Sequence, residues 1–311
     1  MKKITVLFGL TFLLVFWLEA QEIKVLDTVI IPTEQNNYTA PQFSPDGKKI
    51  LFTQFGFKGL WLYDLEQKSL VQINDYTGAG YEPVFTADGK QIVFRTDEYI
   101  NKRKYSSLAV QNLDDRKIEH LTDKVRHLSP AIMLNSDQLV YKVSDKVKSL
   151  RLSSDKSNQS NVSGDTYGYI DYGKIIIVND GVQKELVPVE NSDYIWFSLS
   201  PDKNEFIFTV VGGNTFIVDI NGNLLADLGN ANSPKWSPDG KWIVYMVDED
   251  DGHVITASDI WTYNIENKTK TQLTKTSDIH EMYPDWSPQV DKIVCALTSG
   301  QIAVINIRID G

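Results

Sequence analysis

Residues 236–245 read Trp-Ser-Pro-Asp-Gly-Lys-Trp-Ile-Val-Tyr, a tight-turn sequence between apolar residues. Proline presets the φ angle at the first central position of a turn, aspartate accepts hydrogen bonds from the backbone that follows it, and glycine adopts the positive φ that completes the turn. Because an apolar residue precedes the turn and a β-branched and aromatic run follows it, the stretch predicts a β-hairpin.

This hairpin sequence occurs six times along the chain, in closer or weaker form. The steps between the first apolar residues of successive copies are 42, 47, 67, 37 and 50 residues. A repeat of roughly 40–50 residues that holds four short strands is typical of a propeller blade. The sequence therefore predicts an all-β fold, a β-propeller of four-stranded blades. The copies start at Phe43, Phe85, Ile132, Leu199, Trp236 and Trp286.

The step of 67 residues after Ile132 is too long for one blade. It contains apolar runs at residues 168–171, 174–178 and 185–189, with a tight Tyr-Gly turn between the first two runs. We interpret these runs as a degenerate extra blade, so the sequence favours seven blades. Six blades with an inserted hairpin is the alternative.

The two ends of the chain are expected to meet in one blade. The last repeat supplies strands near residues 285–286, 293–297 and 302–307, and it lacks a fourth. The apolar run at residues 23–31 belongs to no other blade. We therefore predict that this N-terminal strand closes the ring, which would leave no open gap between blades.

The hairpin of residues 236–241, followed by Asp-Ile-Trp at residues 259–261, resembles the WD40-like PD40 repeat of TolB-like β-propellers. The resemblance covers roughly residues 25–310 and implies a scaffold or adaptor of the cell envelope. Residues 21–40 are too few to form the N-terminal α/β domain of TolB, so we expect a propeller-only relative. The repeat is also similar to those of oligogalacturonate lyases and peptidase propellers, so the resemblance identifies the fold more closely than the function.

The first twenty residues predict a signal peptide. Lys2 and Lys3 precede an apolar run at residues 4–18, which is shorter than the roughly 20 residues of a comfortable membrane span. Cleavage is expected near Ala20, with an uncleaved N-terminal anchor as the alternative. The remaining residues, 21–311, are expected to form a single propeller domain that is periplasmic or secreted and has no membrane anchor after cleavage.

The chain is acidic, with a formal net charge of −10 at pH 7. Two lysines and one glutamate in residues 1–20 give that segment +1, so residues 21–311 carry −11. Nucleic-acid binding needs clustered Lys and Arg, so no nucleic-acid partner is expected. The single cysteine, Cys295, lies in an apolar run, which predicts a buried thiol outside any intramolecular disulfide.

Sequence motifs of catalysis are missing. The chain has no Gly-x-Ser-x-Gly elbow, no phosphate-binding glycine loop and no His-Glu-x-x-His zinc motif, and it has four histidines in all. We therefore expect a non-catalytic scaffold without a cofactor, a monomer that binds an envelope protein. The alternatives are a metal-dependent carbohydrate-active enzyme similar to oligogalacturonate lyase, and a glycan or small-molecule sensor that uses the channel.

The candidate binding site is the mouth of the channel, where each innermost strand begins five or six residues before its turn. Loops at such a mouth carry binding sites while the blades carry the fold. Equivalent repeat positions should form a polar and aromatic ring there. Its predicted members are Asn37, Tyr38, Arg126, His127, Asp193, Tyr194, Asn230, His280 and Glu281.

One acidic loop is a candidate for Ca²⁺ binding. Clustered carboxylates supply the oxygen ligands that this ion prefers, although the spacing does not fit an EF-hand loop. A solvated loop without metal is the alternative. The candidate ligands are Asp248, Asp250 and Asp251.

Overall fold

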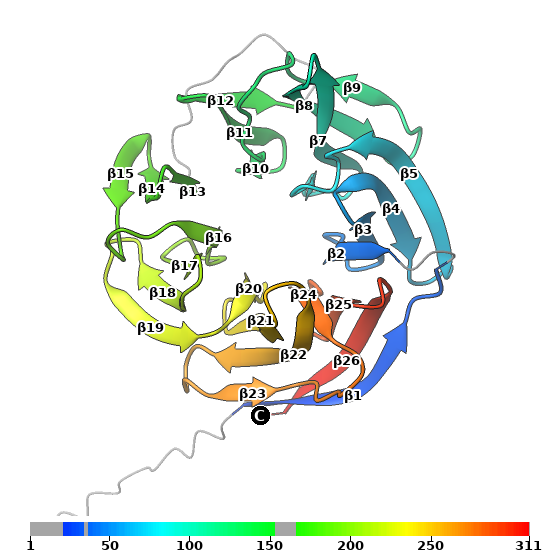
Figure 1. Cartoon of the computed structure of the whole chain (residues 1–311), viewed down its shortest axis with the longest axis vertical. Helices are drawn as coiled ribbons and strands as arrows, with labels where there is room; N and C mark the ends of the chain where they lie inside the picture. The colour runs from blue at the N-terminus through cyan, green and yellow to red at the C-terminus, as the bar shows by residue number, and fades with distance from the viewer. Residues whose placement is uncertain (1–20, 34–36, 153–165, 311) are drawn as a thin grey trace, which may run out of the picture.

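The computed structural model describes residues 21–33, 37–152 and 166–310. These residues form 26 strands in seven antiparallel sheets, which stand around a central axis as the blades of a propeller (Figure 1). The all-β propeller with seven blades is thereby confirmed. The expected signal peptide, residues 1–20, lies outside the described residues. No helix of the length and apolar character needed to cross a membrane occurs in the described part.

The blades are numbered here in chain order from the first complete sheet. Blade 1 comprises β2 (Tyr38–Phe43), β3 (Lys49–Gln54), β4 (Lys58–Asp64) and β5 (Ser69–Thr77). Blade 2 comprises β6 (Val84–Phe85), β7 (Gln91–Ile100), β8 (Arg103–Asn112) and β9 (Ile118–His120). Blade 3 comprises β10 (Ile132–Met133), β11 (Gln138–Val143) and β12 (Lys146–Arg151), and blade 4 comprises β13 (Tyr167–Asp171), β14 (Lys174–Asn179) and β15 (Val182–Leu186).

The second half of the ring is more regular. Blade 5 comprises β16 (Tyr194–Leu199), β17 (Glu205–Val210), β18 (Thr215–Asp219) and β19 (Leu224–Gly229). Blade 6 comprises β20 (Asn232–Trp236), β21 (Trp242–Asp250), β22 (Ile255–Asn264) and β23 (Lys270–Gln272). Blade 7 comprises β24 (Glu281–Trp286), β25 (Lys292–Leu297), β26 (Ile302–Asp310) and the N-terminal β1 (Glu22–Ile30).

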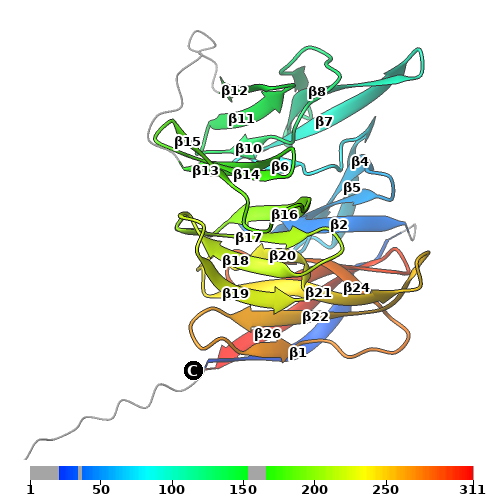
Figure 2. The ribbon, with the colours of Figure 1, turned by 60° about the vertical axis from the view of Figure 1, so that its left-hand side comes forward.

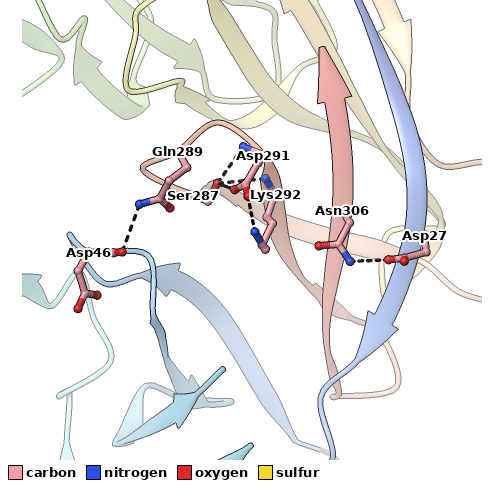
Figure 3. Close-up of polar contacts among 7 residues, drawn as sticks. All are labelled: Asp27, Asp46, Ser287, Gln289, Asp291, Lys292 and Asn306. Atoms are coloured by element: carbon pink, nitrogen blue, oxygen red, sulfur yellow. Dashed lines mark hydrogen bonds and ion pairs between the residues drawn. The ribbon is translucent and has the colours of Figure 1, made fainter. Parts of the chain in front are cut away.

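The ring closes as the sequence predicts. Strand β1 pairs antiparallel with β26, in a register that runs from Glu22 opposite Asp310 to Ile30 opposite Ala303. Figure 1 shows β1 beside β26 at the outer edge of blade 7. A second contact joins blade 7 to blade 1, because the side-chain amide of Gln289 donates a hydrogen bond to the carbonyl oxygen of Asp46 over 3.2 Å (Figure 3).

The recurrent turn is held by its own side chains. In blade 6 the hydroxyl of Ser237 donates to Oδ1 of Asp239 over 2.6 Å and accepts the amide of Trp242 over 2.9 Å. In blade 7 the aspartate is displaced along the turn, and Ser287 donates instead to Asp291 over 2.8 Å (Figure 3). The serine therefore sets the turn by satisfying backbone groups that would otherwise be buried without partners.

The aromatic residue before the turn connects neighbouring blades. The indole Nε1 of Trp286 donates to the carbonyl oxygen of Lys235 over 3.2 Å. The indole of Trp236 makes the equivalent bond to the carbonyl oxygen of Ser198 over 3.4 Å. The repeated Trp-Ser-Pro sequence thus codes for a turn and also for a bond to the preceding blade.

Five innermost strands or their approaches share a bulge. The residue three positions before the end of the strand has a positive φ of 48–53° in each case. In four of the five the strand register shifts at the same place, for example between Thr39 and Gln42 in blade 1. A bulge of this kind re-aims the side chains on either side of it. The residues with positive φ are Ala40, Glu82, Trp196, Ser233 and Tyr283.

Blade 4 departs from the expected pattern. The turn between β13 and β14 lies beside the start of blade 5, because a Cβ added at Gly173 would be 3.4 Å from the carbonyl oxygen of Ser192. Strand β13 is the innermost described strand of blade 4, yet it runs in the direction that the second strand takes in the other blades. Blades 3 and 4 have three strands each among the described residues rather than four. The last strand of blade 4 also lies three residues earlier than expected, at Val182–Leu186.

Candidate functional site

One face of the ring collects the starts of the innermost strands and the loops between second and third strands. We call it the mouth face. In blade 1 the amide of Phe55, just after β3, donates to the carbonyl oxygen of Asn37 over 2.9 Å. The same bond in three other blades places three more predicted residues at the equivalent position. Their carbonyl oxygens accept at 2.9–3.0 Å, and they are His127, Asp193 and His280.

This equivalence shifts the predicted register in blade 3 by one residue. Met133, rather than Ile132, corresponds to Phe43, because Met133 pairs with Leu139 as Phe43 pairs with Ile50. His127 is therefore six positions before the turn rather than five, and Arg126 lies one residue further out. The sequence could not show this, because the turn of blade 3 is one residue shorter than that of blade 1.

Two predicted members of the ring are core residues. The ring of Tyr38 packs edge-on against Phe52 and Trp61, with centroid distances of 4.9 and 5.4 Å. Tyr194 is also buried, and its hydroxyl accepts the amide of Val189 over 3.1 Å. Position five before the turn therefore faces the packing between strands, and its aromatic side chains stabilise the blade instead of lining the mouth.

Glu281 is a buried acid at the start of β24. Burial raises the pKa of Glu281 above its ordinary value, and hydrogen bonds from the hydroxyls of Thr276 and Thr274 oppose that rise. Its backbone carbonyl accepts the Ser258 hydroxyl over 2.5 Å. Glu281 thus ties β24 to the third strand of blade 6 and has little surface to offer a partner.

Of the six remaining predicted residues, Asn37 and His280 are half-buried and the other four are exposed on the mouth face. Asp193, Arg126 and His127 are exposed. Asn230 is exposed as well, and its side-chain amide donates to the carbonyl oxygen of Asp248 over 3.0 Å. The four belong to blades 3, 5 and 6 or the loops that start them, so the structure does not gather them into one cluster.

Arg126 and His127 line a cavity of about 470 Å³ where blades 2, 3 and 4 meet. Sequence reasoning missed the other charged residues of this cavity, because they come from β7, β8, β11 and β13 rather than from the approaches to the innermost strands. The full charged set, with the histidine, is Arg95, Lys104, Arg126, His127, Lys142 and Asp171.

The cavity holds more positive than negative charge, in a chain whose net charge is −10. Nε of Arg95 lies 3.1 Å from Oδ1 of Asp97, and the guanidinium lies 4.1 Å from the centre of the Tyr81 ring. Lys142 forms an ion pair with Asp171. Arg126 lies 5.7 Å from the centre of the Tyr105 ring.

A second polar group lies nearer the axis and was also absent from the predicted set. The side chain of Glu82 reaches solvent, but the protein around it removes part of its hydration. This desolvation raises the pKa of Glu82, while the positive charges of Lys235 and Arg95 lower it. Lys235 belongs to blade 6 and Glu82 precedes the innermost strand of blade 2. Charges from opposite sides of the ring therefore interact through the channel.

Eight of the seventeen large apolar side chains that are exposed in the described part of the chain lie on the mouth face. They stand on the loops after second strands and on the loop before β24; Figure 2 shows one of these, the β7–β8 hairpin, extending from the ring. Exposed apolar groups that share one face of a protein are candidates for an interaction surface. We call this set the apolar rim: Phe55, Phe57, Tyr99, Ile100, Tyr172, Val211, Val254 and Ile279.

The acidic candidate for Ca²⁺ forms the extended β21–β22 hairpin. Oδ1 of Asp251 accepts the amides of His253 and Val254 at 2.9 Å each, and Oδ1 of Asp250 accepts the amide of Gly252 over 2.7 Å. Oδ1 of Asp248 accepts the side-chain amide of Asn232 over 2.7 Å. These carboxylates therefore shape the turn, and across the described part of the chain no three His, Cys, Asp or Glu side chains are grouped to hold a metal ion.

Comparison of the structure with solved structures identifies the class, a TolB-like β-propeller fold. The chain is similar to TolB from Acinetobacter baumannii, with 19% identity, a TM-score of 0.53 and 83% of this chain covered. It is also similar to an oligogalacturonate lyase in complex with manganese, with 13% identity, a TM-score of 0.50, and 89% of this chain and 79% of that chain covered.

These likenesses establish the fold alone, because both identities are low. The chain spans 59% of the length of the TolB chain that it matches. In sequence, no family model and no curated protein matches the chain.

Proposed function

We propose that this protein is an exported, non-catalytic propeller that binds another protein of the cell envelope through its mouth face. The observation that carries the proposal is the apolar rim, a set of eight exposed apolar side chains on one face of an acidic chain. Exposed apolar clusters favour association because burying them removes apolar surface from water.

The fold supplies a second physical argument. Each rim residue stands on a loop or a hairpin tip that a closed ring of sheets holds at both ends, so the surface is largely formed before a partner arrives. Binding to a preformed surface avoids much of the entropy cost of ordering loops. Export and a monomeric state are parts of the same proposal, based on the signal-peptide pattern of residues 1–20 and on the closed ring of blades.

The proposal is tested by capture from detergent-solubilised cell envelope with tagged residues 21–311. The test variant combines Phe55→Ser, Tyr99→Ser and Val211→Ser on the mouth face. Its matched control combines Val182→Ser, Leu224→Ser and Leu225→Ser, which are similarly exposed but lie away from that face. We expect the wild type and the control to retain one stoichiometric partner and the test variant to lose it, with all three melting at similar temperatures.

Capture that survives in the mouth-face variant, or that is lost in the control alone, would refute the proposal. A second candidate function, a sensor of small anionic ligands, is favoured by one observation, the basic cavity of about 470 Å³. It predicts that purified protein binds a free anion without any partner.

A further inference from the structure

The cavity between blades 2, 3 and 4 concentrates cations on an acidic protein. Its lining includes Arg95, Lys104, Arg126 and Lys142 against one carboxylate, that of Asp171. A concave site with an excess of one sign of charge attracts ligands of the opposite sign more strongly than a flat surface does. The chemistry of this cavity therefore points to an anion.

Two of the cations are fixed in place. The side chain of Arg95 is 12% exposed and that of its partner Asp97 is 7% exposed, and the hydroxyl of Ser106 donates to the same carboxylate over 2.6 Å. Lys142, 14% exposed, is paired with Asp171. These groups build the floor of the cavity, and their geometry does not have to be assembled when a ligand binds.

The other two cations are left with free binding capacity. Nζ of Lys104 lies 3.7 Å from Asp97, which is already occupied by Arg95 and Ser106. Arg126 is exposed beside the Tyr105 ring, and within the described ranges of the chain no carboxylate pairs with it. A guanidinium presents two parallel N–H donors that match the two oxygens of a carboxylate.

The surroundings of the cavity favour a peptide over a small ion. Tyr172 lines the cavity and is 85% exposed, so it belongs to the cavity and to the apolar rim at once. Tyr99 and Ile100 stand at the tip of the β7–β8 hairpin, whose strands also supply Arg95 and Lys104. A ligand that reaches the cations can therefore also cover apolar side chains.

We propose that this cavity binds an Asp- or Glu-bearing segment of the protein partner, with Arg126 and Lys104 receiving a carboxylate while Tyr172 and the β7–β8 tip cover neighbouring apolar side chains. This inference rests on the proposed function and specifies the chemistry of the partner. Arg126 is the only member of this contact pair that sequence reasoning placed at the mouth.

The test measures fluorescence anisotropy of residues 21–311 with a short labelled peptide that alternates Glu with Leu. The control peptide carries Gln in place of every Glu. We expect binding of the Glu peptide alone, weakened by added salt because charges are screened. We expect Arg126→Ala to weaken it about tenfold or more, the effect of removing a hydrogen bond between charged groups.

Matched variants show whether binding depends on a positive charge as such or on its place in the cavity. Arg126→Lys should recover part of the loss, whereas Lys48→Ala, which removes an exposed cation beside the turn of blade 1, should bind as the wild type does. Equal binding of the Glu and Gln peptides, or unchanged binding in both Arg126→Ala and Lys104→Ala, would overturn the proposal. Binding of inorganic phosphate with no binding of the Glu peptide would also overturn it, in favour of a free-anion site.

The envelope capture described above distinguishes failure of the cavity proposal from failure of the proposed function. If Arg126→Ala still captures the partner while the mouth-face variant does not, docking occurs on the apolar rim and the cavity proposal alone is wrong. If the mouth-face variant retains capture but the Glu peptide still requires Arg126, the proposed docking surface is wrong and the acidic-peptide site stands.

Discussion

The amide nitrogen of Phe43 donates a hydrogen bond to Oδ2 of Asp285 over 2.9 Å, although 242 residues separate the two in the chain. The bond joins the innermost strand of blade 1 to that of blade 7. It lies on the inner side of the ring, whereas the β1–β26 pairing closes the ring at its outer edge. The ring is therefore closed both at its inner side and at its outer edge.

Removing this acceptor should destabilise the ring. Asp285→Ala leaves the amide of Phe43 without its partner at the junction between blades, which costs about 1–3 kcal/mol of unfolding free energy. Urea denaturation followed by fluorescence measures the change. Asp114→Ala, on an exposed turn of blade 2, is the control and should be neutral within about 0.5 kcal/mol. Equal stability of the two variants would show that the bond contributes nothing.

The same residue predicts a pH dependence. Burial raises the pKa of Asp285 above its ordinary value of 3.8, and the opposing effects of Lys235 and of the amides of Phe43 and Trp286 do not cancel that rise. The folded protein therefore holds the proton more tightly than the unfolded chain, so this group lowers stability as pH rises from about 3.8 through the raised pKa. Asp285→Asn should remove this component, seen by comparing urea midpoints across pH 3–7. A variant with the wild-type pH profile would contradict it.

We expect strand β1 to stabilise the protein mainly through one buried side chain. Ile23 is 3% exposed in the core of blade 7, whereas Leu26 of the same strand is 57% exposed. Ile23→Ala should cost about 2–5 kcal/mol, as large-to-small core substitutions do. Leu26→Ala should change stability by less than about 0.5 kcal/mol. Deleting residues 21–31 should lower the melting temperature sharply, and an unchanged melt would exclude closure by β1.

The turn serine makes a separate prediction. Ser237 is fully buried, and Ser237→Ala removes the acceptor for the amide of Trp242 together with the bond to Asp239. A loss of about 1–3 kcal/mol is expected in thermal or urea unfolding. Ser299→Ala, at an exposed hairpin tip, is the matched substitution and should be silent. If both variants behave alike, the side-chain bonds of the turn do not stabilise it.

The single cysteine is a built-in probe of unfolding. Cys295 is buried, and burial, followed by the nearby Glu281, raises the pKa of its thiol. Because the thiolate is the reactive form, labelling by a disulfide reagent at pH 8 should be slow in the native protein and fast in urea. Fast labelling of the native protein would mean that blade 7 opens readily.

The propeller could be predicted because its signal is local. Ser237, Asp239 and Trp242 satisfy one another within six positions, and the same arrangement recurs in other blades. Blade 4 was harder, because it lacks the Pro-Asp pair, and its innermost described strand runs in the direction of a second strand. The predicted mouth residues were only partly right in position, since strand starts alternate between core and surface. Tyr38 is buried in the core, whereas its neighbour in sequence, Asn37, is half-buried.

The sequence by itself determined the repeat, the turns and the closing strand, since each depends on residues that contact close neighbours or on one unpaired apolar run. Only the tertiary structure decided which charges share a cavity. Arg95, Lys104, Arg126 and Lys142 come from three strands of blades 2 and 3 and from the segment between these blades, and no spacing in the chain records their proximity. Stacking of blades around an axis creates that proximity, because it brings loops from successive sheets to the same face.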